Sequence, residues 1–238
     1  MSDLETVVRD LVIANHILAQ EGVLDAYGHV SMRHPERPDR FLISCSRAPE
    51  LVQPDDIGEY DFEGKLVSKT NHKPYLERFI HGGIYEARPD VMTVIHSHAE
   101  DTLHFSITNQ PLIPVIHNAS RMGTHIPVWD PRDSFGDTNM LVSNAAQGRD
   151  LAARGLGSNS VVLMRGHGFA AAGTRLDETV GLAVYLPKNA RVLTNALRSG
   201  GKVNGLSEGE VDQINNGPLR HDWKRAWEYW CRRAGNKS

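Results

Sequence analysis

The first twenty residues repeat apolar and polar positions with the period of an α-helix. The apolar positions that share one face are Leu4, Val7, Val8, Leu11 and Leu18. Ser2 and Glu5 have the spacing of a capping box, and Gly22 is of the residue type that most often follows the end of a helix. The pattern predicts an amphipathic helix at the N-terminus.

From residue 26 to residue 46 the apolar period shortens to two, which is typical of strands. The segments GHVSMRH and RFLISCS both alternate, and HPERPDR between them is rich in turn-forming residues. We therefore expect two paired strands. The segment YDFEGKLV that follows predicts a further hairpin, with Glu63 and Gly64 in its turn.

The next segment, NHKPYLERFIHGGIYEARPD at 71–90, returns to the helical period. Pro74 falls in the expected first turn, and Pro89 lies past the expected end. The expected buried face consists of Leu76, Phe79, Ile80 and Ile84.

An apolar strand is expected at 91–98, followed by a mixed segment and a helix at 144–154. The run SNSVVLMRGHG predicts another strand that ends at His167. A helix is expected at 177–198, and Pro187 should kink it because proline lacks the backbone donor.

The C-terminal part begins with a second capping box at Ser207 and Glu210 and continues with Trp223, Trp227 and Trp230. It predicts a helical extension over about 206–234, whose first two tryptophans we expect to pack in the core. The chain has no internal repeat and no low-complexity linker. We therefore expect one α/β domain over 1–238, with a mostly antiparallel sheet between helical layers.

Composition excludes several classes of partner. The net charge of −3 arises from 29 acidic and 26 basic residues spread along the chain, which argues against nucleic acid or an anionic membrane as partners. No apolar run approaches the roughly 20 residues of a membrane span. The polar start MSDLETVVRD argues against secretion. Cys45 and Cys231 are too few for a disulfide framework, so we expect a cytoplasmic protein.

Two histidines lie two positions apart at the end of the strand expected at 91–98. Residues i and i+2 of a strand point the same way, roughly 6.5–7 Å apart, so His96 and His98 can bind one metal ion. His167 is the natural third ligand, and Gly166 and Gly168 beside it leave room for close approach. Because the chain has twelve histidines, a polar strand edge is the alternative.

Glu77 precedes His96 by 19 residues and belongs to the helix expected at 71–90. A carboxyl group beside a metal and partly removed from water is well placed to act as a general acid or base. The alternative is a solvated side chain paired with Arg78 or His81.

The order Glu77, then HSH, then MRGHG resembles the class II aldolase and adducin family over roughly residues 5–200. The resemblance implies a three-layer αβα fold around a central, mainly antiparallel sheet. It implies one divalent ion (Zn, Mn, Co or Fe(II)) held by His96, His98 and His167, with Glu77 as acid/base and possible fourth ligand. It also implies a homotetramer with its sites at subunit interfaces.

The chain departs from the sugar-phosphate members of that family at three phosphate-binding places. They read here Gly28-His29, Ser46-Arg47 and Tyr75-Leu76. The loss of glycine at 47 and of two hydroxyls at 75 and 76 predicts a flatter, more apolar pocket that suits an aromatic ring. Ser46 is then a substrate-binding residue, Arg47 a fork for a carboxylate, and His29 a partner for a ring hydroxyl or second carboxylate. A surface arginine and a strand-edge histidine are the alternatives.

This altered pattern is similar to the members that decarboxylate hydroxylated aromatic or pyridine dicarboxylates, of the 3-hydroxy-2-methylpyridine-4,5-dicarboxylate or dihydroxyphthalate type. The similarity implies a non-oxidative decarboxylation of an ortho-hydroxy acid through a metal-stabilised enolate. Protonated Glu77 would deliver a proton to the ring carbon that bears the carboxylate. The alternatives are a class II (retro-)aldolase acting on a small hydroxy-ketone or sugar phosphate, an adducin-like interaction module, and an iron-dependent oxygenase.

Overall fold

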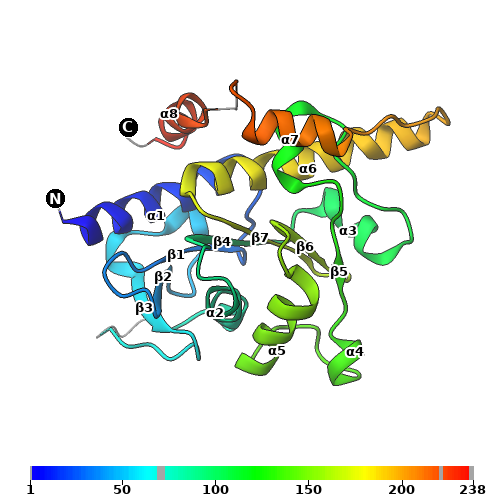
Figure 1. Ribbon diagram of the computed structural model, residues 1–238. Coiled ribbons are helices and arrows are strands. Elements are labelled where there is room, and N and C mark those ends of the chain that lie inside the picture. Colours follow the sequence, from blue (N-terminus) through cyan, green and yellow to red (C-terminus); the bar gives the residue numbers. More distant parts are fainter. Residues whose placement is uncertain (1, 69–72, 220–221, 236–238) are drawn as a thin grey trace.

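The computed structural model describes residues 2–68, 73–219 and 222–235. A seven-stranded sheet lies between two layers of helices (Figure 1). The order of its strands is β3-β2-β1-β4-β7-β6-β5, and every neighbouring pair is antiparallel except β5 and β6. The expected three-layer αβα fold is confirmed.

The strands are β1 (His29–Arg33), β2 (Arg40–Ser44), β3 (Ile57–Asp61), β4 (Thr93–Ser97), β5 (Val128–Trp129), β6 (Val161–Met164) and β7 (Gly168–Gly173). The helices are α1 (Asp3–Gln20), α2 (Arg78–Ala87), α3 (Glu100–Ile107), α4 (Arg132–Phe135), α5 (Ala145–Asp150), α6 (Leu176–Arg198), α7 (Glu208–Asn216) and α8 (Lys224–Arg233). A π-helical segment, Leu151–Leu156, continues α5.

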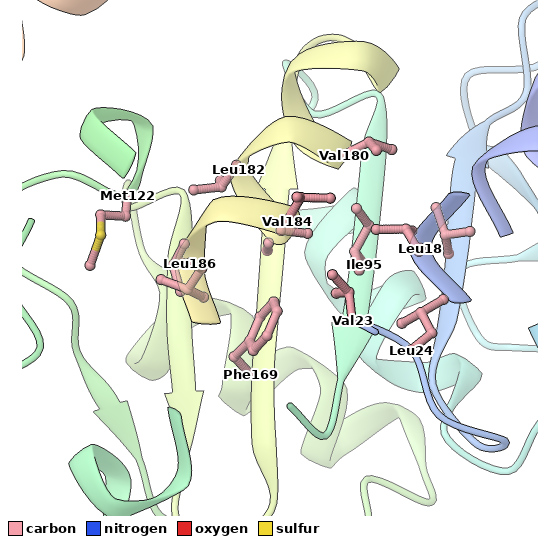
Figure 2. Packing of buried hydrophobic residues seen from close by; sticks show 14 of the residues in the cluster. Leu18, Val23, Leu24, Ile95, Met122, Phe169, Val180, Leu182, Val184 and Leu186 are labelled. Atoms are coloured by element: carbon pink, nitrogen blue, oxygen red, sulfur yellow. The ribbon is translucent and has the colours of Figure 1, made fainter. Parts of the chain in front are cut away.

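Helices α1 and α6 cover one face of the sheet, and α8 packs against both of them (Figure 1). Figure 2 shows Val184 and Leu186 of α6 packed toward Phe169 of β7, with Leu18 of α1 beside Ile95 of β4. Removing each such side chain from water contributes about 1.5–3 kcal/mol, so this layer anchors the two central strands β4 and β7.

Helices α2 and α5 cover the opposite face. Their backbones meet at two glycines: a Cβ on Gly83 would lie 2.3 Å from the carbonyl oxygen of Gly148, and one on Gly148 would lie 2.1 Å from that of Phe79. Only glycine permits this contact. It fixes the start of α2, and with it Glu77, relative to the sheet.

Most of the expected local structure is present. The Ser2–Glu5 and Ser207–Glu210 capping boxes both form. Strands β1 and β2 pair as expected. The turn after β3 holds Gly64 at φ +75°, and its returning arm pairs with β3 through the bridge of Tyr60 with Leu66. The amide of Asp61 donates to the carbonyl oxygen of Lys65, and the amide of Val67 donates to that of Glu59.

The helix expected from residue 71 begins later, at Arg78, so Glu77 is its N-cap residue. The chain before it pairs with the end of β2: Pro74 bridges Cys45, and the carbonyl oxygen of Lys73 accepts from the amide of Ser46. Positions 71 and 72 of the expected helix lie outside the described residues. Leu76 is 51% exposed, so its assignment to the buried face was wrong.

The C-terminal segments close the layer that contains α1. Helix α6 runs continuously through Pro187, and the predicted kink there stays a prediction. Trp223 and Trp230 are buried against α6, while Trp227 is partly buried. Within the described parts of the chain, no helix is both long enough and apolar enough to cross a membrane.

Candidate metal centre and active site

The centre of the sheet carries the first site residues. His96 is the fourth residue of β4, and His98 follows the strand directly. On the neighbouring strand, His29 lies directly opposite His96 in the antiparallel register, so both rings are on the same face, with centroids 5.2 Å apart.

The structure brings together all four residues that the sequence predicted for the metal site. One ligand atom each of Glu77, His96, His98 and His167 lies within 4.8 Å of the others. Glu77 Oε2 is 3.4 Å from His167 Nε2 and 3.7 Å from His96 Nε2, and the Nε2 atoms of His96 and His98 are 3.0 Å apart.

The far nitrogen atoms of the three rings show why these Nε2 atoms face one another. Nδ1 of His96 lies 3.1 Å from the carbonyl oxygen of Phe169, that of His167 lies 3.1 Å from the carbonyl oxygen of Met140, and that of His98 lies 3.1 Å from Asp25 Oδ2. These partners only accept, so in each neutral ring the hydrogen is on Nδ1 and the lone pair is on Nε2.

Three lone pairs and a carboxylate oxygen therefore point at the same space. Nε2 atoms of this tautomer cannot hydrogen-bond each other, so in the neutral rings the 3.0 Å approach of His96 and His98 is unfavourable, and a cation bound by both lone pairs would relieve it. Three neutral imidazoles with an adjacent carboxylate are a donor set suited to zinc and related divalent ions. The residues present fit such an ion.

Asp25 is the site residue that sequence reasoning missed. Its carboxylate accepts from His98 and also from the backbone amides of Tyr27 and Gly28, at 2.8 Å each. Burial alone would raise the pKa of Asp25, but these donors outweigh it and lower that pKa. The Asp-x-x-Gly turn was a local signal in the sequence, whereas its contact with His98 spans 73 residues.

Glu77 is held from two sides. Its Oε1 accepts from the backbone amide of Val142 at 2.9 Å, while Oε2 faces the histidines. Burial raises the pKa of this carboxyl group, yet positive charge at His167 and His96, together with the Val142 amide, outweighs burial and lowers it to about 2. With neutral rings, a cation held by them would supply that positive charge. The group is therefore a carboxylate at neutral pH before a ligand binds.

His167 lies in the turn between β6 and β7, where two backbone features hold it. Gly166 has φ +61°, and a Cβ on Gly168 would lie 2.1 Å from the carbonyl oxygen of Ser97. Met140, whose carbonyl accepts from His167, has φ +66°, a strained value for a side-chain-bearing residue. The strain falls where the carbonyl meets the site.

A cavity of about 500 Å³ opens over Glu77, His98 and His167. Its walls include Tyr27, Tyr75, Leu76 and Leu141, and both His29 and Ser46 line it. The hydroxyl of Tyr75 donates to the carbonyl oxygen of Arg47, so this residue turns an aromatic ring, 4.6 Å from that of His29, toward the cavity.

Among the three residues predicted to bind the substrate, Arg47 is the one that the structure does not place in the cavity lining. Its guanidinium pairs with Asp56, with Nη1 3.2 Å from Oδ2, and its side chain is 44% exposed. The substrate-binding roles of Arg47, His29 and Ser46 stay proposals.

The fold and the candidate metal site define the class of protein, an α/β scaffold with three histidines and a glutamate around one point, and comparison with known proteins identifies its family. The chain belongs to the family described as Class II Aldolase and Adducin N-terminal domain, which matches residues 9–194. The resemblance inferred from Glu77, HSH and MRGHG is confirmed.

Two relatives cover nearly the whole chain. It is 35% identical over 247 residues to Decarboxylase tropJ of Talaromyces stipitatus, covering 94% of this chain and 92% of that protein. It is 24% identical over 237 residues to 3,4-dihydroxyphthalate decarboxylase of Arthrobacter keyseri, covering 92% and 90%. Among solved structures, L-fuculose 1-phosphate aldolase from Glaciozyma antarctica superimposes with a TM-score of 0.76 at 21% identity, covering 99% and 93%. The last comparison shows a shared fold.

Proposed function

We propose that this protein is a divalent-metal-dependent lyase that removes a carboxylate as carbon dioxide, without oxidation, from an ortho-hydroxy aromatic or pyridine (di)carboxylate. The observation that carries the proposal is the convergence of three Nε2 lone pairs beside Glu77, under a cavity walled by Tyr27, Tyr75, Leu76 and Leu141. Both full-length relatives described above are named decarboxylases.

His96, His98 and His167 would hold the ion, with Glu77 beside it. When bound, the ion supplies Lewis-acid stabilisation of negative charge on the oxygen next to the breaking C–C bond. The chain's contribution to binding is the cavity wall: the ring of Tyr75 offers a flat apolar surface, and Ser46 and His29 offer polar atoms at its edge.

Glu77 carries the proton in this proposal. Because its pKa is lowered to about 2, it enters the reaction as a carboxylate and first accepts the hydrogen of the substrate's ring hydroxyl on Oε2. It then delivers that proton to the ring carbon bearing the leaving carboxylate. Carbon dioxide leaves, the electrons of the broken bond return to the ring oxygen, and the ring becomes aromatic again.

The test is a direct assay of the released fragment. Protein loaded with zinc or manganese is incubated with 3,4-dihydroxyphthalate, other hydroxyphthalates and hydroxypyridine dicarboxylates, and carbon dioxide is measured. Glu77→Gln should keep the bound metal, measured by elemental analysis, and lose about 10²- to 10⁴-fold in turnover. Full turnover with normal metal content in Glu77→Gln would falsify its role as the proton carrier.

The second candidate is a class II (retro-)aldolase acting on a hydroxy-ketone or sugar phosphate. The fold shared with the fuculose phosphate aldolase supports it. Against it, Tyr75 and Leu76 line the cavity where hydroxyls would hold phosphate. Release of an aldehyde from L-fuculose 1-phosphate, with no carbon dioxide from any aromatic acid, would favour the aldolase.

The proposal also includes the identity of the metal, the location of the protein and its oligomeric state. The ion is zinc, manganese, cobalt or ferrous iron, and elemental analysis of the purified protein identifies it. The protein is a cytoplasmic homotetramer built from one domain over 1–238 with a helical extension at about 206–234. Sedimentation analysis measures the tetramer.

A further inference from the structure

A buried chain of hydrogen bonds leads from the cavity into the layer below it. His29 Nδ1 lies 2.7 Å from His81 Nε2, His81 Nδ1 lies 2.6 Å from Ser31 Oγ, and Ser31 Oγ lies 2.8 Å from the hydroxyl of Tyr85. All four side chains are buried, and only His29 also lines the cavity. The proposed reaction uses none of the three inner groups.

Each of the three contacts holds one hydrogen, so the chain can run in only two directions. In the first, Tyr85 donates to Ser31, Ser31 donates to His81 Nδ1, and His81 Nε2 donates to His29 Nδ1. In the second, His29 Nδ1 donates to His81 and His81 Nδ1 donates to Ser31, which leaves one hydroxyl hydrogen, that of Ser31 or of Tyr85, without an acceptor among the described residues. The backbone contact of Tyr85 with Val94 does not supply that acceptor, since it lowers the pKa of the phenol as a donor does. A buried hydroxyl hydrogen without an acceptor is disfavoured, so the first direction prevails.

This direction determines what His29 presents to a ligand. Because Nδ1 accepts from His81, the neutral ring carries its hydrogen on Nε2, which has no hydrogen-bond partner among the described residues. The neighbouring ring of His96 has the opposite arrangement, with its hydrogen on Nδ1. The candidate metal site thus offers the lone pair of His96 for a cation, and the cavity wall beside it offers the N–H of His29 for an acceptor.

We propose that the relay His29–His81–Ser31–Tyr85 holds His29 as a fixed hydrogen-bond donor for a carboxylate oxygen of the ligand, with His81 as its positioning residue. The identity of the ligand as an aromatic acid rests on the proposed function. The tautomer of His29 is independent of that function, because it follows from the hydrogen bonds of the relay.

The relay binds and does not supply protons. If His29 gave up its Nε2 hydrogen, each proton would shift one place along the chain and leave Tyr85 as a buried phenolate. Burial raises the pKa of Tyr85, which opposes that outcome. Glu77 therefore remains the proton carrier, and His29 orients the second substituent of the substrate.

The first experiment reads the tautomers directly in the metal-free full-length protein. Nitrogen-15 NMR of labelled histidine should show protonated Nε2 and unprotonated Nδ1 for both His29 and His81, with signals assigned by their loss in His29→Gln and His81→Gln. A protonated Nδ1 on His29 overturns the proposal.

The second experiment measures binding of phthalate, an inert dicarboxylate, to the zinc-loaded protein by calorimetry. His81→Phe should weaken binding about fivefold to tenfold, the loss expected for one hydrogen bond that orients a donor. His81→Gln, whose amide can still donate to His29 Nδ1, should stay within about threefold of the wild type. Neutral dimethyl phthalate should bind equally to all three.

Tyr60→Phe is the matched structural control, since it removes a buried phenol of the same core layer that shares no hydrogen bond or ring contact with the relay among the described residues. Equal phthalate binding by wild type, His81→Phe and Tyr60→Phe overturns the positioning role, and the NMR result stands even if His81→Phe does not fold. If the tautomers and the phthalate series hold but no aromatic acid is decarboxylated, the proposed function fails and the relay remains.

Discussion

At the scale of single residues, the chemistry of the site depends on the partners of the far ring nitrogens as much as on the ligands. Carbonyl oxygens of Phe169 and Met140 and the carboxylate of Asp25 orient the rings of His96, His167 and His98. Such partners fix the tautomer and strengthen the ligand. Asp25 is the only side chain among these three, so it is the one that mutation can remove.

Asp25→Asn should weaken the affinity for zinc about 10- to 100-fold, because His98 loses a charged acceptor while the amides of Tyr27 and Gly28 keep an oxygen to bond. Competition with a chromophoric chelator measures the affinity. Asp10→Asn, which removes a partly exposed carboxylate paired with Arg9 on α1, is the control and should leave the affinity for zinc unchanged. Equal affinities in the two variants would contradict this role of Asp25.

Cys45 gives a pH dependence whose sign follows from its surroundings. Burial and the nearby carboxylate of Asp56 raise the pKa of this thiol to about 11. In the unfolded chain the thiol ionises near 8.5. Between these values the unfolded state binds fewer protons than the native state, so stability is complete below the lower pKa and falls as pH rises toward the higher one.

Wild-type protein should therefore lose about 2 kcal/mol more unfolding free energy than Cys45→Ala when the pH is raised from 8 to 10. Urea unfolding at both pH values measures it. The cavity left by alanine is present at both and cancels in the difference. Equal losses would show that the thiol titrates alike in both states.

At the scale of secondary-structure elements, the contact between α2 and α5 determines where Glu77 lies. Gly83→Ala places a methyl group against the backbone of Gly148 and should destabilise the protein by about 2 kcal/mol or more. Gly209→Ala in α7 is the matched control: its Cβ meets nothing nearer than Ser207 Oγ at 3.9 Å, so helix propensity should stabilise the protein by about 0.5–1 kcal/mol. Thermal and urea unfolding should give opposite signs, and the same sign in both would contradict the packing argument.

The spacing of apolar residues and the capping residues predicted those helices and strands whose position depends on the local sequence. They placed α1, the β1–β2 pair and the start of α7, and they failed where a contact distant in sequence decides. Strand β7 reads GFAAAG and is buried nearly throughout, so it shows no alternation. The start of α2 moved to Arg78 because Pro74 pairs with Cys45 instead.

At the scale of the whole molecule, the parts of the site that depend on residues close in sequence could be predicted, and the parts that depend on contacts distant in sequence could not. His96 and His98 are two residues apart on one strand, so their convergence follows from strand geometry. Asp25 and the relay behind His29 join residues 50–73 positions apart, and only the folded sheet brings these together. Strand geometry and the family resemblance supplied the candidate metal ligands, while their hydrogen-bonding partners required the structure.

Binding of the metal should also stabilise the fold. His96 in β4 and His98 directly after that strand hold facing lone pairs 3.0 Å apart, and a bound cation would remove the repulsion between them. A ligand that binds only the native state at 100 times its Kd contributes about 2.7 kcal/mol. For a chain of this length that raises the Tm by roughly 5–10 °C. Calorimetric scans of protein treated with chelator, with and without added zinc, should show this difference.

His98→Ala removes one of the two facing lone pairs and one metal ligand. The metal-free form of this variant should therefore lack the repulsion, and the rise of its Tm on addition of zinc should largely disappear. An equal rise in wild type and His98→Ala would mean that zinc binds elsewhere.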